Sequence, residues 1–218
     1  MFAIFDSDFG FNEKILILVF FVFAVLFSLI LHEIAHGYVA LKCGDPTAKA
    51  MGRLSFNPKK HLDPIGTICF LLFGLGWARP VPINPNNFRN YKLGCFLVSL
   101  AGIVMNLILG FIFSFFFALC YQNAGAESIW TLIFYYAMSV NICFAIFNLL
   151  PIPPLDGFNI LASFFSPWNK TIQWMRQNSF IIFIVFIIIM DSGNFIGTAF
   201  DFVANIFLKL WEVVLPLK

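Results

Sequence analysis

Long apolar stretches separated by short polar segments dominate the hydrophobic pattern of this chain. Three of them reach the roughly 20 residues that a membrane-spanning helix needs: 15–41, 93–121 and 128–150. The stretch 65–77 is too short to cross a bilayer, and we interpret it as a re-entrant or partly inserted segment. Shorter apolar runs follow at 155–165, 180–190 and 195–215. The pattern predicts an all-α polytopic membrane protein with about five to six membrane segments.

Two polar segments, 42–64 and 78–92, interrupt the apolar pattern and are rich in proline and basic residues. Short alternating pieces at 47–51 and 53–56 predict a small β-hairpin or sheet after the first helix. Neither polar segment is long enough for a PDZ-type or nucleotide-sensing domain. We therefore expect residues 1–218 to form a single membrane-embedded domain.

Composition supports a lipid environment. Hydrophobic residues make up 61% of the chain and charged residues 11%, whereas soluble domains carry about 25% charged residues. The net charge of +2 and the lack of a basic run with interleaved aromatic residues indicate neither a nucleic acid nor a nucleotide as partner. The five cysteines form no CxxC pair, which speaks against a zinc ribbon or a disulfide framework.

The distribution of charge predicts which side of the membrane each loop faces. If 65–77 re-enters the bilayer, the basic segments fall on one side: 42–61, 79–92 and 170–176. The acidic segments then fall on the other side: the N-terminus, Glu127 and 191–201. A full crossing by 65–77 would separate the first two basic segments. The positive-inside rule places the basic side in the cytoplasm.

The first apolar stretch contains an HExxH motif formed by His32, Glu33 and His36. Residues four apart share one face of a helix, so both imidazoles can reach the same metal ion. Zinc lowers the pKa of a bound water, and Glu33 is placed to accept its proton. An ionisable group near the bilayer centre costs at least about 2.5–3.5 kcal/mol, which favours a functional role. The alternatives are a polar cluster that packs helices together and a helix end that lies in water.

Asp156 is the candidate third ligand, because a catalytic zinc site takes three protein ligands. The stretch 128–150 arrives at the same side of the membrane as the two histidines, and Asp156 follows it. Other acidic residues are less well placed: Asp63, Asp191 and Asp201. The structural alternative for Asp156 is a helix N-cap after a proline turn.

Three further polar residues have plain structural explanations. His61 lies outside any span, and we interpret it as a solvated or interfacial histidine. Asn106, four residues after Gly102, could form an interhelical hydrogen bond beside a small-residue contact. Asn148 could bond the helix end that precedes Pro151.

The combination of HEIAH (32–36) with NLLPIPPLDG (148–157) resembles the site-2 protease family of intramembrane zinc metalloproteases. The intervening GDPTAKAMGRLSFNPKKHLDPIGT, WARPVPINPNNF and SLAGIVMN are similar too, so the resemblance covers about residues 25–165. Phe158 departs from the LDGG of many members, which changes packing but removes no ligand. The chain resembles the compact prokaryotic type that has no PDZ or CBS domain.

The resemblance implies a role for each site residue. His32, His36 and Asp156 would bind one Zn²⁺ and Glu33 would activate water. The asparagines that the family uses to position substrate or stabilise the reacting carbonyl correspond to Asn148 and Asn106. The catalytic core would cover about residues 14–165, followed by C-terminal accessory helices at about 179–215.

The sequence therefore predicts a zinc-dependent intramembrane endopeptidase that cleaves transmembrane proteins in regulated intramembrane proteolysis. We expect it in a prokaryotic cytoplasmic (inner) membrane, surrounded by lipid, with its active site toward the cytoplasm. One alternative is a non-catalytic scaffold or chaperone of the same fold. Another is a metal transporter, although transporters often carry paired internal repeats, which this sequence lacks.

Overall fold

The computed structural model describes residues 10–73, 76, 78–190 and 195–215, and the regular elements in these residues are helices. The long helices are α1 (Phe11–Cys43), α4 (Tyr91–Ala124) and α5 (Ile129–Leu149). The shorter ones are α2 (Thr47–Ala50), α3 (Pro64–Phe73), α6 (Asp156–Ser163), α7 (Lys170–Gln177), α8 (Ser179–Met190) and α9 (Phe195–Glu212). Two 3₁₀ turns lie in the loops, η2 (Pro58–Lys60) and η3 (Pro85–Asn87). The prediction of a largely helical chain is confirmed.

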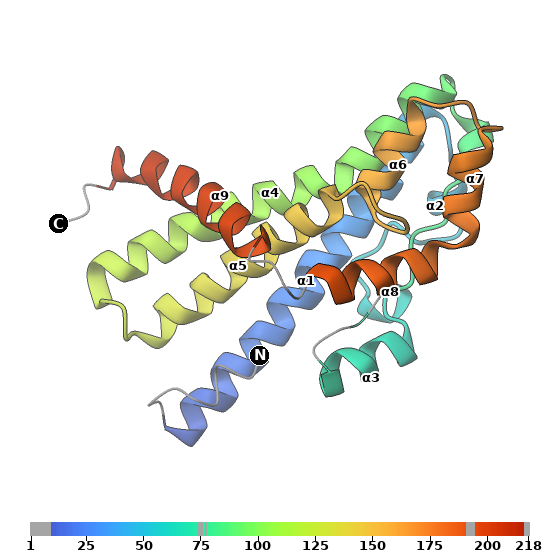
Figure 1. Ribbon diagram of the computed structural model, residues 1–218. Coiled ribbons are helices and arrows are strands. Elements are labelled where there is room, and N and C mark those ends of the chain that lie inside the picture. The colour runs from blue at the N-terminus through green and yellow to red at the C-terminus, as the bar shows by residue number, and fades with distance from the viewer. Residues whose placement is uncertain (1–9, 74–75, 77, 191–194, 216–218) are drawn as a thin grey trace.

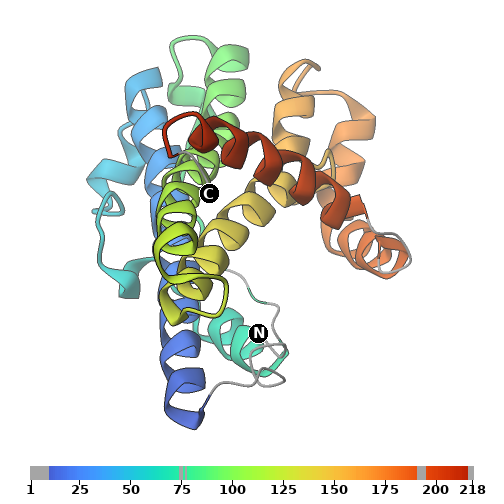
Figure 2. The ribbon, with the colours of Figure 1, turned by 90° about the vertical axis from the view of Figure 1, so that its left-hand side faces the viewer.

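Helix α4 lies at the centre of the molecule and packs against both α1 and α5 (Figure 1). Helix α6 packs on the first half of α4, while α9 crosses α4 and α5 farther along (Figure 2). Among the described residues, α1, α4 and α5 are long and apolar enough to cross a membrane. The bent pair α7 and α8 raises the number to four if it forms one span. The five to six membrane segments predicted include the re-entrant segment, which is not counted among these spans.

The short helix α3 agrees with the interpretation of 65–77 as less than a full span, because its 10 residues cannot cross a bilayer. Residues 74–75 and 77 of that stretch lie outside the described residues. Helix α9 is not among the candidate spans. Its sequence contains Asp201, Lys209 and Glu212, which interrupt the apolar pattern.

The β-hairpin predicted for residues 47–56 does not form. Thr47–Ala50 is a helical turn, and Gly52 follows at a φ of +63°, which glycine adopts without strain. Asp45 accepts a hydrogen bond from the backbone N–H of Thr47, the first residue of this turn, so that donor is paired. In the described residues, strand-like pairing is limited to one isolated antiparallel bridge between Leu62 and Ala78.

A buried carboxylate ties the end of α1 to the loop before α4. Gly44, at a φ of +115°, ends α1, and Asp45 follows it with no exposed surface. The Asp45 carboxylate accepts bonds from the hydroxyl of Thr47 and, at 2.7 Å each, from the Asn84 N–H and the Asn87 side-chain amide. This network sets the position of α4 against α1, on which the metal centre depends.

Candidate metal centre

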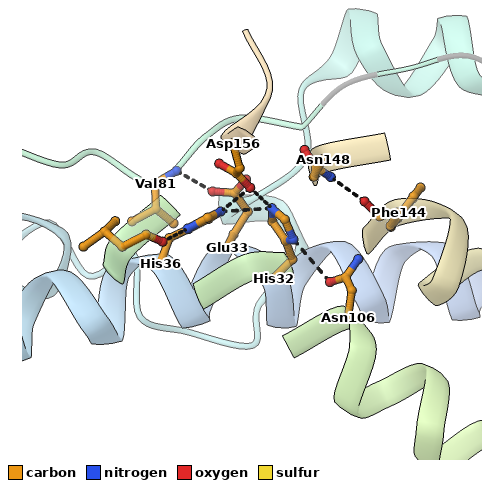
Figure 3. A network of polar contacts seen from close by, with 9 residues as sticks. His32, Glu33, His36, Val81, Asn106, Phe144, Asn148 and Asp156 are labelled. Carbon is orange, nitrogen blue, oxygen red and sulfur yellow. Dashed lines mark hydrogen bonds and ion pairs between the residues drawn. The ribbon is translucent and has the colours of Figure 1, made fainter. Parts of the chain in front are cut away.

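Helix α1 presents its two histidines on one face, as the four-residue spacing requires. The Nε2 atoms of His32 and His36 lie 3.0 Å apart, and both side chains are buried (Figure 3). This arrangement confirms that the HExxH segment is helical and that its imidazoles converge.

Helix α4 orients both imidazole rings through contacts to their Nδ1 atoms. The Nδ1 atom of His36 donates to the main-chain carbonyl of Val98 at 2.6 Å. The Nδ1 atom of His32 lies 3.2 Å from the side-chain oxygen of Asn106. Both partners are acceptors, so each Nδ1 carries the proton and each Nε2 of a neutral ring presents a lone pair. Such outer contacts are typical of histidines that bind metals.

Asp156 completes the group from the first turn of α6. Its Oδ2 atom lies 3.2 Å from the Nε2 atoms of both His32 and His36. This oxygen is buried and accepts no hydrogen bond. With both imidazoles neutral, three lone-pair atoms converge on one point, and a bound cation would offset their repulsion. Two imidazoles and one carboxylate form a donor set that catalytic zinc sites use.

The close approach of α4 to the two histidines requires a glycine at position 102. A Cβ atom there would lie 2.5 Å from the Nε2 atom of His36 and would also overlap the His32 ring. Gly102 is buried, and it lies between Val98 and Asn106 on the face of α4 that supports the imidazoles. The small-residue contact considered from the sequence is therefore a contact with the ligands themselves.

Glu33 is held by a backbone group from a distant part of the chain. Its Oε2 atom accepts the Val81 N–H at 2.7 Å (Figure 3). Arg53 fixes the same segment by donating to the carbonyls of Arg79, at 2.8 Å, and Pro80, at 3.0 Å. The carboxylate that the sequence assigned as the base is thus oriented.

Sequence reasoning did not identify Val81 or Arg53. The residues on both sides of Val81 are prolines, which lack an N–H group. Among residues 80–82, Val81 therefore carries the only backbone donor. That alternation is a signal that could have drawn attention to the position. The identity of its acceptor could not be read from the sequence.

The two asparagines suggested by the resemblance behave differently. Asn106 bonds His32, as described. The side-chain amide of Asn148 donates to the Phe144 carbonyl of its own helix at 3.0 Å (Figure 3). The role that the resemblance implies for Asn148 stays a prediction.

The remaining sequence candidates do not join the three ligands. His61 is fully buried rather than solvated, and its Nε2 atom lies 2.7 Å from the Ser55 carbonyl. Asp63 accepts the Gly66 N–H at 2.9 Å at the start of α3. Asp201 is exposed on α9, and Asp191 lies outside the described residues. Within the part of the chain that the structure describes, His32, His36 and Asp156 form the group able to hold a metal.

These features define a metal centre built between apolar helices, and similar proteins identify its family. The family model of peptidase family M50 matches residues 117–191, which include Asp156. Over 191 residues the chain is 41% identical to the Bacillus subtilis (strain 168) protein named "Putative zinc metalloprotease YwhC", covering 81% of this chain and 83% of that protein. The chain belongs to peptidase family M50.

Two more distant relatives carry the same kind of name. "Putative zinc metalloprotease MJ0611" of Methanocaldococcus jannaschii is 31% identical, covering 74% of this chain and 76% of that protein. "Putative zinc metalloprotease Rip2" of Mycolicibacterium smegmatis is 28% identical, covering 75% of this chain and 64% of that protein. No solved structure matches the chain. The protein is a membrane metalloprotease, and its cofactor is zinc.

Proposed function

We propose that this protein is an intramembrane endopeptidase that cleaves transmembrane proteins. The observation that carries the proposal is the place of the ligands in the fold. His32 and His36 lie within α1, and the groups that orient them lie on α4, and both helices are candidate membrane spans. A peptide bond must therefore enter the helical bundle to meet the metal centre.

The residues around the metal centre have complementary tasks in peptide hydrolysis. His32, His36 and Asp156 would hold the zinc, which supplies Lewis-acid polarisation of the carbonyl and lowers the pKa of water. Glu33 accepts the proton of the attacking water and returns it to the leaving amine. The Val81 N–H keeps the Glu33 carboxylate in one orientation while the proton moves.

The substrate must lose its helical hydrogen bonds locally before it reacts. A peptide bond inside a helix is bonded to neighbouring turns, and in lipid those bonds have no replacement. We expect substrates to contain helix-destabilising residues near the cleaved bond. Such a requirement is consistent with a role in regulated intramembrane proteolysis.

The active site is proposed to face the cytoplasm of a prokaryotic cell, from its cytoplasmic membrane. Basic residues gather near the end of α1 that carries the histidines: Lys42, Lys49, Arg53, Lys59 and Lys60. The positive-inside rule assigns such an end to the cytoplasm. The two alternative functions, a scaffold and a metal transporter, do not need a base beside the ligands, whereas Glu33 is retained and oriented.

The proposal is tested by measuring zinc and cleavage on the same preparations. Purified wild type and Glu33→Gln would be compared for bound zinc and for cleavage of a single-span reporter with a helix-breaking centre. We expect equal zinc content, with cleavage only by wild type and only without chelator. A Glu33→Gln variant that cleaves at the wild-type rate would refute the role of the base. A wild type that is zinc-replete yet inactive on reporters and on the membrane proteins of its host would refute intramembrane proteolysis.

A further inference from the structure

A cavity lies between the start of α4, α6 and α7, and its lining includes Val98, whose carbonyl accepts from His36. Its volume is about 250 Å³. Its polar lining comes from all three helices and includes Tyr91, Ser99, Asn159, Ser163, Gln173 and Arg176. Arg176 is the one charged residue of the lining, which contains no carboxylate. A cavity of this composition favours an anion.

The charge of Arg176 is not neutralised by a neighbouring acid. Its guanidinium lies over the ring of Phe158, 5.5 Å from the centroid. Among the described residues, no carboxylate oxygen lies within ion-pair distance of it. A guanidinium held against an aromatic face keeps its fork of donors available for a phosphate or a carboxylate.

If α1 and α4 cross the bilayer, the cavity lies at the level where the headgroups begin. Tyr91, in its lining, is the first residue of α4. Arg89, two residues before Tyr91, donates its N–H to the carbonyl of Cys43, the last residue of α1, at 2.9 Å. Two candidate spans therefore end at this level, and α6 and α7 lie at the same end of the molecule (Figure 1).

The surface around the cavity has the composition of a membrane interface. Phe164, Phe165, Trp168 and Trp174 are exposed, and Trp168 and Trp174 keep 82% and 59% of their surface accessible. Tryptophan is enriched at the headgroup level of membrane proteins. Helix α7 is bent by 75° from α8, which contains no charged residue, so α7 lies along the interface if α8 inserts.

We infer that this cavity binds the headgroup of an acidic phospholipid, with the phosphate paired to Arg176 and the acyl chains lying along the exposed aromatic residues. Charge complementarity favours an acidic lipid over a zwitterionic one. The occupied cavity would hold α6 in place through Asn159 and Ser163. Because Asp156 begins the same helix, the lipid would support the position of the third metal ligand.

Lipid binding can be measured on the purified full-length protein by native mass spectrometry. The probes are phosphatidylglycerol and phosphatidylcholine with identical acyl chains, added separately to the protein in detergent. We expect tighter binding of phosphatidylglycerol, and a loss of about fivefold in Arg176→Gln, the factor that one basic residue near an anionic surface contributes. Lys209→Gln is the matched control, because it removes one positive charge from α9, outside the cavity.

A second variant tests the same site while keeping Arg176 and its contact with Phe158. Ser166→Asp places a carboxylate in the lining of the cavity. In wild type the Ser166 hydroxyl accepts a hydrogen bond from the main-chain N–H of Trp168, and the aspartate side chain can still accept that bond. We expect it to lose phosphatidylglycerol binding as Arg176→Gln does.

Three outcomes would overturn the inference. One is wild-type binding of phosphatidylglycerol in both cavity variants, and another is an equal loss in Lys209→Gln. The third is displacement of the lipid by inorganic phosphate alone, which would assign the cavity to a soluble anion. If Arg176→Gln cleaves the reporter more slowly but binds lipid as wild type does, the cavity would instead be assigned to substrate binding.

Discussion

The Nδ1 atom of His36 donates to the main-chain carbonyl of Val98 across 2.6 Å, and this bond fixes the proton on the side of the ring away from Asp156. The Nε2 atom is left with its lone pair directed at His32 and Asp156. A main-chain carbonyl cannot donate, so this tautomer does not depend on a side chain that could rotate. Helix α4 thereby prepares the histidine on α1 for a metal.

Asn106 performs the same task for His32, and its removal should weaken zinc binding. Asn106→Leu leaves His32 Nδ1 without its acceptor. We expect zinc affinity to fall about 10–100-fold, the usual effect of losing an outer-shell partner. Competition with a chromophoric chelator measures the affinity. Asn141→Leu is the control, since Asn141 is equally buried but bonds the Ala137 carbonyl of α5; an equal loss there would contradict the prediction.

Gly102→Ala should abolish zinc binding because the added methyl group overlaps both imidazoles. The comparison is Gly110→Ala on the same helix, where the new Cβ would lie 3.1 Å from Cγ1 of Ile142 and no closer than 3.5 Å to Phe207, away from the histidines. We expect the second variant to keep its zinc, as measured by elemental analysis of the purified proteins. Normal zinc content in Gly102→Ala would show that α4 can move away from α1.

The hydrogen bond from Val81 to Glu33 can be removed without touching the carboxylate. Val81→Pro deletes the N–H, whereas Val81→Ala keeps it and trims the buried side chain. We expect Val81→Pro to lower the rate of reporter cleavage more than Val81→Ala does, with zinc content unchanged. Both losses should stay below the roughly 10²–10⁴-fold loss expected for Glu33→Gln as a general base. Equal cleavage rates in the two Val81 variants would show that the Val81 N–H has no role in catalysis.

Asp45 should make the protein sensitive to acid. Burial alone raises the pKa of the Asp45 carboxyl, but the hydrogen bonds from Thr47, Asn84 and Asn87 outweigh it and hold this pKa below its ordinary value. A carboxyl whose pKa is lower in the folded state stabilises the fold fully above its unfolded pKa, near 3.9. That stabilisation is lost as the pH falls through the folded pKa.

The measurement is thermal unfolding of wild type and Asp45→Ala in detergent across a series of pH values. At neutral pH we expect the variant to be less stable by about 1–3 kcal/mol, because buried donors lose their acceptor. The difference should shrink in acid below pH 4. Asp201→Ala, which removes an exposed carboxylate from α9, should match wild type throughout. A difference for Asp45→Ala that does not change with pH would contradict the assignment.

Much of this arrangement is determined by local sequence. Apolar stretches of sufficient length predicted α1, α4 and α5, because a chain in lipid must satisfy its backbone groups within each helix. The spacing of His32 and His36 matches the helical repeat, so their convergence followed from α1 alone. Asp156 was predicted from the need for a third ligand and from the side of the membrane that its segment reaches.

The tertiary structure decided the contacts that orient those residues. The Val98 carbonyl and the Val81 N–H are main-chain groups, and neither the sequence of α4 nor the prolines around Val81 name the side chain that each one meets. Gly102 stands out in the sequence as a small residue, but only the packing of α4 on α1 shows that it makes room for the two imidazoles. The helical turn at 47–50, where alternation suggested a strand, depends on Asp45, whose partners lie about 40 positions along the chain. Local periodicity predicts which residues share a helix face, but only packing determines which backbone atoms meet that face.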